Sequence, residues 1–262
     1  MIKLGIIVGS GLEYFSYLDM ETVGFSIKTV GFGYNNDSTY DQIVYDFFST
    51  KIKEKEVQLV VIPRHGAKHT IYPHDVPYQE YMRIFKELEC SAVLGFTACG
   101  SLKGDIRPCS AHVIDQFIDL TSSRKLSYPE KVTHTPMGSP FDKDITKLIV
   151  NTHTSKTASI LDIMPKTIVT INGPRFSTKA ESLYYRTIGG DLVNMTTATE
   201  CIAAALENIP YAAVAFVTDY DAWNDQIPHV TMEEVQSRFN DFKKFMKDFL
   251  PKFLKAYVNK NA

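Results

Sequence analysis

Two aspartates separated by one residue close an apolar segment and could share a proton. Asp219 and Asp221 follow Tyr211 to Val217, a short run that is typical of a buried strand. Side chains alternate along an extended chain, so both carboxyls point to one side. Two neighbouring carboxyls do not both ionise cheaply, and one tends to keep its proton. Such a pair can donate one hydrogen bond and accept another, as an adenine edge requires. A solvated strand end or a helix cap is the alternative.

Two other predicted strand ends carry groups that suit an anion. Gly9-Ser10-Gly11 is a turn whose N–H groups and hydroxyl could cradle one, although it lacks the third glycine of a dinucleotide fingerprint and the lysine of a Walker loop. Arg64 and His65 end another strand, and a guanidinium fork matches phosphate oxygens. A buried arginine without an anionic partner is costly, so Arg64 should either face solvent or hold an anion. A plain turn and a solvated Arg-His pair are the alternatives.

Two more strand ends are rich in small and hydroxyl residues. The segment Thr97-Ala98-Cys99-Gly100-Ser101 would let a ligand approach the backbone closely. Cys99 is a poor candidate nucleophile, because nothing in the sequence indicates a lowered thiol pKa. Thr196 could cap the helix that follows it or bind a phosphate, and Met195 offers a soft apolar surface to a sugar or base. Together these segments predict a pocket with an anion at one side and a base at the other.

The elements that must position these groups alternate between strand and helix. This pattern predicts an α/β fold in which helices flank a central mixed, mostly parallel β-sheet, with ligands at the strand ends. We expect a single domain, residues 1–262, because the alternation resumes after the irregular segments Thr121–Pro140 and Thr152–Lys166. We expect the last helix to start at a capping box of Thr231 and Glu234 and to break near Pro251. The predicted strands are Lys3–Val8, Ile43–Phe48, Val57–Pro63, Ala92–Thr97, His112–Asp119, Thr167–Ile171, Leu192–Met195 and Tyr211–Thr218, and the predicted helices are Tyr78–Glu89, Asp142–Asn151, Thr178–Thr187, Thr197–Glu207 and Thr231–Tyr257.

The composition excludes several partner classes. A net charge of −2 with no long basic run offers nothing to nucleic acid or to an anionic membrane. No apolar stretch approaches the roughly 20 residues that cross a bilayer. The four cysteines lack metal-ligand spacing. Because the start of the chain reads as a strand and not as a secretory signal, we expect a cytoplasmic protein, with the nucleus as a second compartment.

Seven segments occur in an order that resembles the trimeric purine nucleoside phosphorylase family, and within it the methylthioadenosine phosphorylases. The resemblance runs from the first strand to about Trp223 and implies a homotrimer that phosphorolyses a nucleoside, with inorganic phosphate as co-substrate and no metal or organic cofactor. The matching segments are Gly9–Leu12, Arg64–Ile71, Thr97–Leu102, Asp115–Asp119, Gly173–Ser177, Asn194–Thr197 and Thr218–Trp223.

The resemblance also assigns roles to individual residues. It implies that Arg64, His65, Asp219 and Asp221 carry the catalysis. The implied phosphate ligands are Ser10, Arg64, His65, Thr97, Ala98 and Thr196. The implied nucleoside contacts are Phe176, Met195, Asp219, Asp221, Met232, Val235 and Gln236, together with His134, which family members lend to a neighbouring subunit's 5′ pocket.

Two positions bear on the base. Relatives that act on 6-oxopurines carry asparagine where Asp219 stands and glutamate where Ser177 stands, so both residues favour 6-aminopurines. Sites built on hydrogen bonds reject such mismatches by about 10⁴–10⁵. A 6-oxopurine phosphorylase, a hydrolase and a non-catalytic nucleoside sensor are the competing hypotheses.

The sequence departs from the methylthioadenosine phosphorylases at several positions. Gln236 replaces an aliphatic residue of the methylthio pocket, and the chain ends at Ala262, before the tail that helps to close that pocket in relatives. Both features make adenosine a second candidate substrate. Asn172 stands where an acid is usual, and Thr199 stands where a proline is usual.

Overall fold

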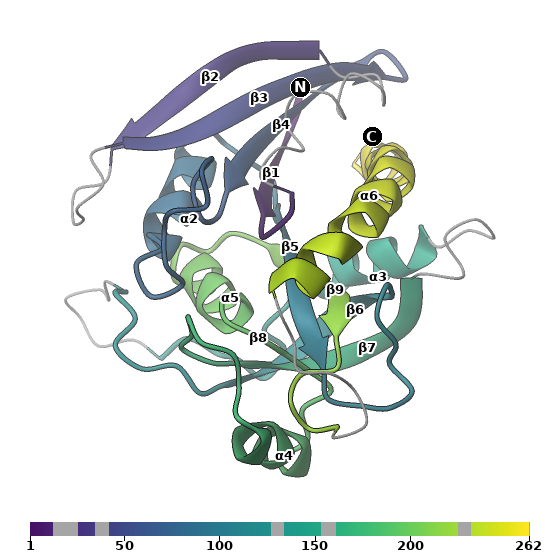
Figure 1. Cartoon of the computed structure of the whole chain (residues 1–262). Helices are drawn as coiled ribbons and strands as arrows, with labels where there is room; N and C mark the ends of the chain where they lie inside the picture. Colours follow the sequence, from purple (N-terminus) through teal and green to yellow (C-terminus); the bar gives the residue numbers. More distant parts are fainter. Residues whose placement is uncertain (13–25, 35–41, 127–133, 153–160, 225–231, 262) are drawn as a thin grey trace.

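The computed structural model describes residues 1–12, 26–34, 42–126, 134–152, 161–224 and 232–261 (Figure 1). In this part of the chain nine strands form one connected sheet, in the order β2-β3-β4-β1-β5-β8-β7-β6-β9. The strands are β1 (Ile2–Val8), β2 (Ser26–Tyr34), β3 (Gln42–Ile52), β4 (Lys55–Pro63), β5 (Val93–Ser101), β6 (Ala111–Asp119), β7 (Leu161–Thr170), β8 (Leu192–Asn194) and β9 (Tyr211–Asp219). The helices are α2 (Tyr78–Glu87), α3 (Lys143–Asn151), α4 (Lys179–Thr187), α5 (Thr197–Leu206) and α6 (Met232–Lys260).

The sheet is mixed, as predicted, but part of it closes on itself. Strand β5 pairs with β8 and also with β9, so β5, β8, β7, β6 and β9 form a ring. The parallel pairs are β1–β4, β1–β5, β5–β9, β6–β7 and β7–β8, and the other described pairs are antiparallel. The predicted central sheet is therefore a barrel with an extension of β1, β4, β3 and β2. Periodicity identifies strands but does not say which strands pair, so it did not predict the closure.

The predicted strands and helices are all present, with a few different boundaries. Strand β2 was missed, because Gly31 and Gly33 interrupt its alternation. Strand β7 starts at Leu161 and not at Thr167, so part of the segment expected to be irregular is strand. Pro165 and two register shifts against β6 interrupt the pattern there. The single domain over residues 1–262 stays a prediction.

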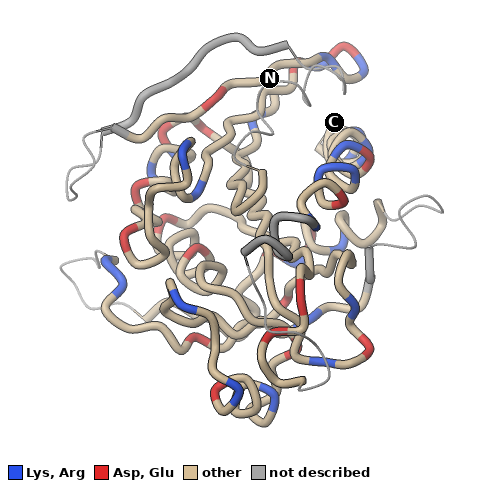
Figure 2. Tube along the Cα trace, in the orientation of Figure 1, with Lys and Arg blue, Asp and Glu red and all other residues tan. Residues whose placement is uncertain are grey.

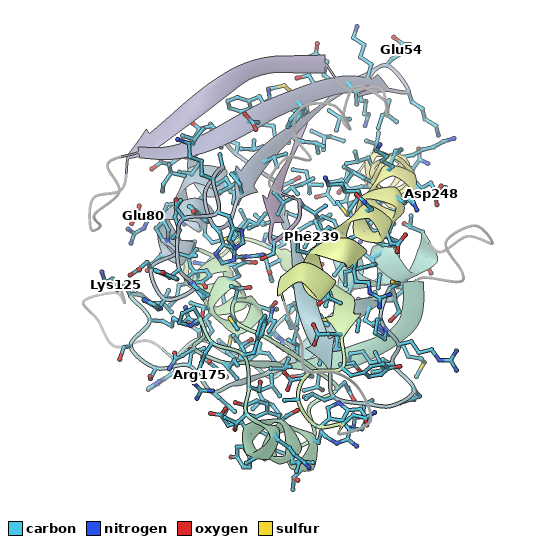
Figure 3. The ribbon with its side chains drawn as sticks, viewed as in Figure 1. Glu54, Glu80, Lys125, Arg175, Phe239 and Asp248 are labelled. Carbon is cyan, nitrogen blue, oxygen red and sulfur yellow. The ribbon has the colours of Figure 1, made fainter. Side chains whose placement is uncertain are left out.

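The core has a layer on each side of the sheet. Side chains alternate in β1, so Leu4, Ile6 and Val8 join one buried cluster and Ile7 joins the other. Helices α3 and α6 cover the first side, and α2 and α5 cover the second (Figure 1). The labelled charged side chains in Figure 3 point outward, whereas Phe239 points inward.

Helix α6 crosses Pro251 without ending, so the break expected there is wrong. A proline removes one backbone donor from a helix, but buried side chains on both sides of it, including Leu250, Phe253 and Leu254, hold the helix on the barrel. The predicted capping box of Thr231 and Glu234 lies outside the residues whose side chains are described. A capping box is found instead at the start of α4.

Charged residues of both signs are interspersed along α6 (Figure 2). Among the described residues no helix is both long enough and apolar enough to span a membrane. The 29-residue α6 is long enough to span a membrane, but it carries too many charged residues to do so.

A run of stacked aromatic rings attaches α6 to the barrel. Phe249 stacks on Phe245 at 5.2 Å and on Phe253 at 5.7 Å, and it meets Phe96 of β5 edge-on at 6.1 Å.

We predict that Phe249→Ala lowers the free energy of unfolding by about 3–5 kcal/mol, because it leaves a cavity between helix and barrel. Urea denaturation measures the change. The control is Asn240→Ala at an exposed position of the same helix, for which we expect a change within about 0.5 kcal/mol. Equal effects of the two substitutions would show that α6 does not depend on this stack.

Candidate active site

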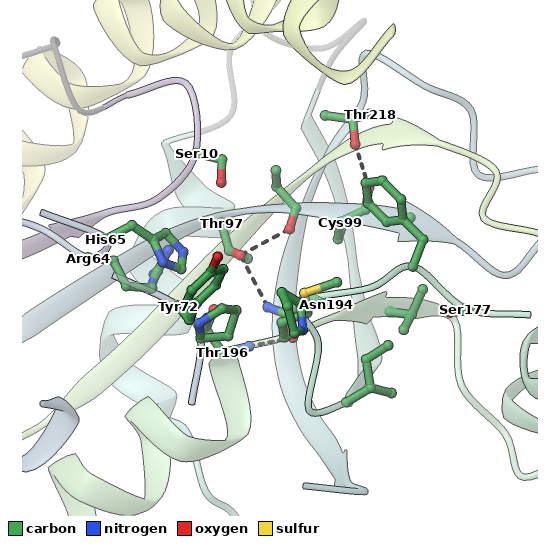
Figure 4. A pocket seen from close by; sticks show the side chains of 18 of the residues that line it. Ser10, Arg64, His65, Tyr72, Thr97, Cys99, Ser177, Asn194, Thr196 and Thr218 are labelled. Carbon is green, nitrogen blue, oxygen red and sulfur yellow. Dashed lines mark hydrogen bonds between the residues drawn. The ribbon is translucent and has the colours of Figure 1, made fainter. Parts of the chain in front are cut away.

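A cavity of about 480 Å³ lies at the C-terminal ends of six strands, β1, β4, β5, β7, β8 and β9, which is where α/β sheets bind ligands. Figure 4 shows Ser10, Arg64 and His65 at one side of it and Ser177 and Thr218 at the other. The predicted site residues that line this one cavity are Ser10, Arg64, His65, Thr97, Ala98, Phe176, Met195, Thr196, Asp219 and Asp221.

Arg64 is buried and holds an anionic partner that belongs to the protein. Its side chain is 1% exposed, and its Nε and Nη2 both donate to the carboxylate of Glu200, which is 0% exposed. Nη1 donates to the carbonyl of Phe96 at 3.1 Å. Arg64 thus holds an anionic group, as expected of a buried arginine, but the group is a carboxylate of the protein itself, which the sequence alone did not reveal. Burial opposes the charge, but Glu200 outweighs it and raises the pKa of Arg64.

The guanidinium still has donors for a ligand. Among the described residues its bonds occupy three of five N–H groups. Tyr211 fixes the partner by donating to Glu200 Oε2 at 2.6 Å. The network leaves no room for side chains nearby. A Cβ at Gly9 would collide with Arg64 Nη1, and one at Gly95 would lie 2.9 Å from Glu200 Oε2.

Asn194 positions hydroxyls at the same end of the cavity. Its Nδ2 donates to the hydroxyls of Thr97 at 3.1 Å and Thr197 at 2.6 Å, and its Oδ1 accepts from Thr170 at 3.0 Å. Thr196 immediately precedes α5, and its Oγ1 is buried without a partner among the described residues. A buried hydroxyl at a helix N-terminus is suited to bind an anion.

The hydrogen bonds of His65 fix which ring nitrogen carries a proton. Its Nδ1 lies 2.8 Å from the carbonyl of Ile71, which can only accept, so Nδ1 is the donor. Nε2 then accepts in the neutral ring and donates in the cation. The ring lies 4.8 Å from that of His69, another residue of the cavity lining. This end of the cavity therefore combines Arg64, a histidine and several hydroxyls.

The two aspartates at the opposite end have different surroundings. Asp219 accepts from the hydroxyl of Thr218 and from the backbone N–H of Asp221, both at 2.7 Å. Burial raises the pKa of Asp221, and this is opposed by the hydroxyls of Ser182 and Ser177. Burial thus raises the pKa of Asp221, while both oxygens of Asp219 accept hydrogen bonds.

Cys99 lines the cavity but is not suited to be a nucleophile. Burial and the charge of Asp219 raise its pKa well above the usual value, and the thiolate is the reactive form. Met195 and Phe176 also line the cavity; Met195 is packed against Gly173, and Phe176 is 41% exposed.

Four predicted nucleoside contacts are not placed in the cavity. His134 is exposed and does not line it. Met232, Val235 and Gln236 lie in the first turns of α6, outside the residues whose side chains are described.

Sequence reasoning missed Glu200 and Asn194. A charged residue in the otherwise apolar helix α5 was an available signal for Glu200, because a glutamate is almost never fully buried without a partner. No comparable signal marks Asn194, whose role depends on three segments that meet only in the fold.

Fold and site together define an α/β protein whose strand-end cavity can hold an anion and a polar ring side by side. The sequence profile of the phosphorylase superfamily matches residues 3–255, and the chain belongs to that superfamily. An S-methyl-5′-thioadenosine phosphorylase of Danio rerio is 36% identical over 241 residues, which cover 89% of this chain and 81% of the relative. One of Nitrosopumilus maritimus is 39% identical over 180 residues, covering 68% and 67%. The structure of a methylthioadenosine phosphorylase from Schistosoma mansoni in complex with adenine has a TM-score of 0.83 at 29% identity and covers 100% of this chain and 93% of its own.

We predict that Glu200→Gln weakens binding of inorganic phosphate by about 10- to 100-fold. An amide would present an N–H group to a guanidinium nitrogen, which would turn the guanidinium, and charge-assisted bonds are worth about 1.5–3 kcal/mol. Titration calorimetry with phosphate measures the affinity. The control is Glu207→Gln near the end of α5, where Glu207 pairs with Arg83 outside the cavity lining. Unchanged or tighter phosphate binding in Glu200→Gln would mean that Glu200 does not orient Arg64 for phosphate.

Proposed function

We propose that this protein cleaves 5′-methylthioadenosine by phosphorolysis, giving adenine and 5-methylthioribose 1-phosphate. One observation carries the proposal. A single cavity has Arg64, His65 and Thr196 at one end and the Asp219–Asp221 pair at the other. These ends suit a phosphate and a purine, and Met195 of the same cavity lining offers an apolar surface to a sugar.

The reaction requires charge stabilisation at both ends. When the glycosidic bond breaks, positive charge develops on the sugar and negative charge on the purine. A phosphate held by Arg64 and Thr196 stabilises the first charge and attacks the anomeric carbon. A proton delivered from the aspartate pair to the purine ring neutralises the second. The phosphate forms the new bond to the sugar, and the purine leaves with the electron pair of the old one.

The aspartate pair also selects the base. An adenine offers a ring nitrogen that accepts and an amine that donates, and a pair holding one proton matches both. A 6-oxopurine carbonyl facing Asp219 would leave buried polar groups unpaired. Ser177 at the same end is small and neutral, in agreement with an adenine site.

The relatives support the choice of nucleoside. The relatives of Danio rerio and Nitrosopumilus maritimus carry the name S-methyl-5′-thioadenosine phosphorylase, and a mutant of the Schistosoma mansoni adenosine/methylthioadenosine phosphorylase has been solved in complex with methylthioadenosine. We carry methylthioadenosine over to this chain as the first substrate, with adenosine as the second because of Gln236.

The remaining parts of the proposal concern assembly and cofactors. We propose a homotrimer in which His134 serves a neighbouring subunit, since it is exposed and outside the cavity of its own chain. We propose that phosphate is the only co-substrate and that no metal or organic cofactor takes part. The cytoplasmic location stays a prediction.

We predict that adenine is released from methylthioadenosine and adenosine only when inorganic phosphate is present. An activity panel of methylthioadenosine, adenosine and inosine, each with and without phosphate, makes the measurement. Equal release without phosphate would make the protein a hydrolase. Faster cleavage of inosine would contradict our interpretation of Asp219, and tight binding without turnover would indicate a nucleoside sensor.

We predict that Asp219→Asn lowers turnover of methylthioadenosine by about 10²–10⁴-fold, because the leaving purine loses its proton route. Steady-state kinetics measures the turnover, and thermal unfolding shows whether the variant is folded. Asp221→Asn is the matched comparison, because Asp221 is the other carboxyl of the pair and burial raises its pKa. A folded Asp219→Asn variant with normal turnover would place the proton source on Asp221 or on water.

A further inference from the structure

Arg124 is a polar side chain that the sequence analysis did not single out, and it lies behind the wall of the cavity. It is half-buried and does not itself line the cavity. Its Nη2 lies 2.9 Å from the carbonyl oxygen of Met195, 3.2 Å from that of Asn172 and 3.3 Å from that of Ile171. Its Nη1 donates to the carbonyl of Pro73. One guanidinium thus bonds backbone from three separate segments.

These three segments each contribute to the cavity wall. Pro73, Ile171 and Met195 line the cavity, although they follow strands β4, β7 and β8, which are far apart in the sequence. Pro73 and Met195 also approach each other at Gly173, where a Cβ would lie 3.1 Å from Met195 Cγ and 3.4 Å from Pro73 Cγ. The segments of the wall are therefore packed together at Gly173 and joined by the hydrogen bonds of Arg124.

Neighbouring contacts keep the guanidinium in place. Tyr78 donates to the same Pro73 carbonyl at 2.7 Å, and its ring lies 5.7 Å from Arg124 Cζ. The side chain of Asn172 makes two hydrogen bonds of 3.0 Å with Ser122, one to its backbone N–H and one to its hydroxyl. Asn172 stands where relatives usually carry an acid, and here its amide both accepts a hydrogen bond from Ser122 and donates one to it.

The two ends of the cavity have separate supports. Arg64 is held by Glu200, and Thr97 is held by Asn194. Among the described residues, Arg124 makes no hydrogen bond to the side chains of either pair. Its carbonyl partners belong to Pro73, Ile171, Asn172 and Met195, and none of these is among the expected phosphate ligands.

We infer that Arg124 is a positioning residue for the nucleoside half of the site, fixing the wall formed by Pro73, Ile171 and Met195. The inference rests on the proposed function, because its kinetic test measures KM values for the proposed reaction. A planar guanidinium can bond several carbonyls in fixed directions, whereas a lysine ammonium acts as a point charge. Arg124→Lys should therefore keep the charge and lose most of the positioning.

The test compares Arg124→Ala and Arg124→Lys with wild type. We expect KM for methylthioadenosine to rise about 10- to 100-fold in Arg124→Ala and by a smaller factor in Arg124→Lys. KM for phosphate should stay within about twofold, because the phosphate end has its own supports. Added guanidinium should partly restore the low nucleoside KM of Arg124→Ala. Arg83→Ala, on α2 and away from the cavity lining, is the matched control and should change neither constant.

Several outcomes would overturn the inference. These are equal rises of both KM values, an unchanged nucleoside KM, and a loss of thermal stability with normal KM values. If Arg124→Ala does not fold, Arg124→Lys decides by the same criteria.

Calorimetric titration with adenine and with inorganic phosphate separates this inference from the proposed function. If wild type shows no phosphate-dependent cleavage, the proposed function fails. The Arg124 variants are then judged on affinity alone, and selective weakening of adenine binding supports the positioning role. Equal weakening of adenine and phosphate, or no weakening, contradicts it.

Discussion

The buried ion pair between Arg64 and Glu200 is the constraint on which the rest of the site depends. Neither charge could be buried alone, since an unpaired ion in the interior costs several kcal/mol. The pair also accounts for details elsewhere in the sheet. Tyr211 donates to the carboxylate, and the positions of Gly9 and Gly95 have no space for a side chain. This one interaction thus constrains residues at the ends of β1 and β4 and within β5, α5 and β9.

Strand β5 brings the two ends of the cavity together. It pairs with β9 along one side and with β1 and then β8 along the other, so the barrel closes at this strand. Arg64 therefore bonds the Phe96 carbonyl of β5, while further along the same strand Gly100 lies against the aspartate pair. The closure places the phosphate end and the purine end of the cavity along one strand.

The sequence predicted the elements of this fold better than their connections. Periodicity identified β1 and β9 because their apolar runs are short and uninterrupted, and it missed β2, whose glycines break the pattern. The cavity residues were predictable where a strand ends in a functional group, as at Arg64 and Asp219. Glu200, Asn194 and Arg124 were not predicted, because each acts by contacting backbone or side chains that are distant in sequence. The expected break at Pro251 failed for the same reason, since packing on the barrel outweighs one missing hydrogen bond.

The pairing of Arg64 with Glu200 has an electrostatic consequence for the proposed reaction. Taken together the pair is neutral, so it supplies hydrogen-bond donors to a phosphate without cancelling the negative charge that the phosphate brings. Beside the buried Arg64 and Glu200, charges interact more strongly than in solution. A bound phosphate dianion would therefore retain more of its attraction for the positive charge that develops on the sugar. A solvated or unpaired arginine would bind the anion more tightly in the ground state, and binding of that kind does not lower the barrier unless it grows in the transition state. Burial of Glu200 beside Arg64 thus favours a phosphate that is firmly oriented and still reactive.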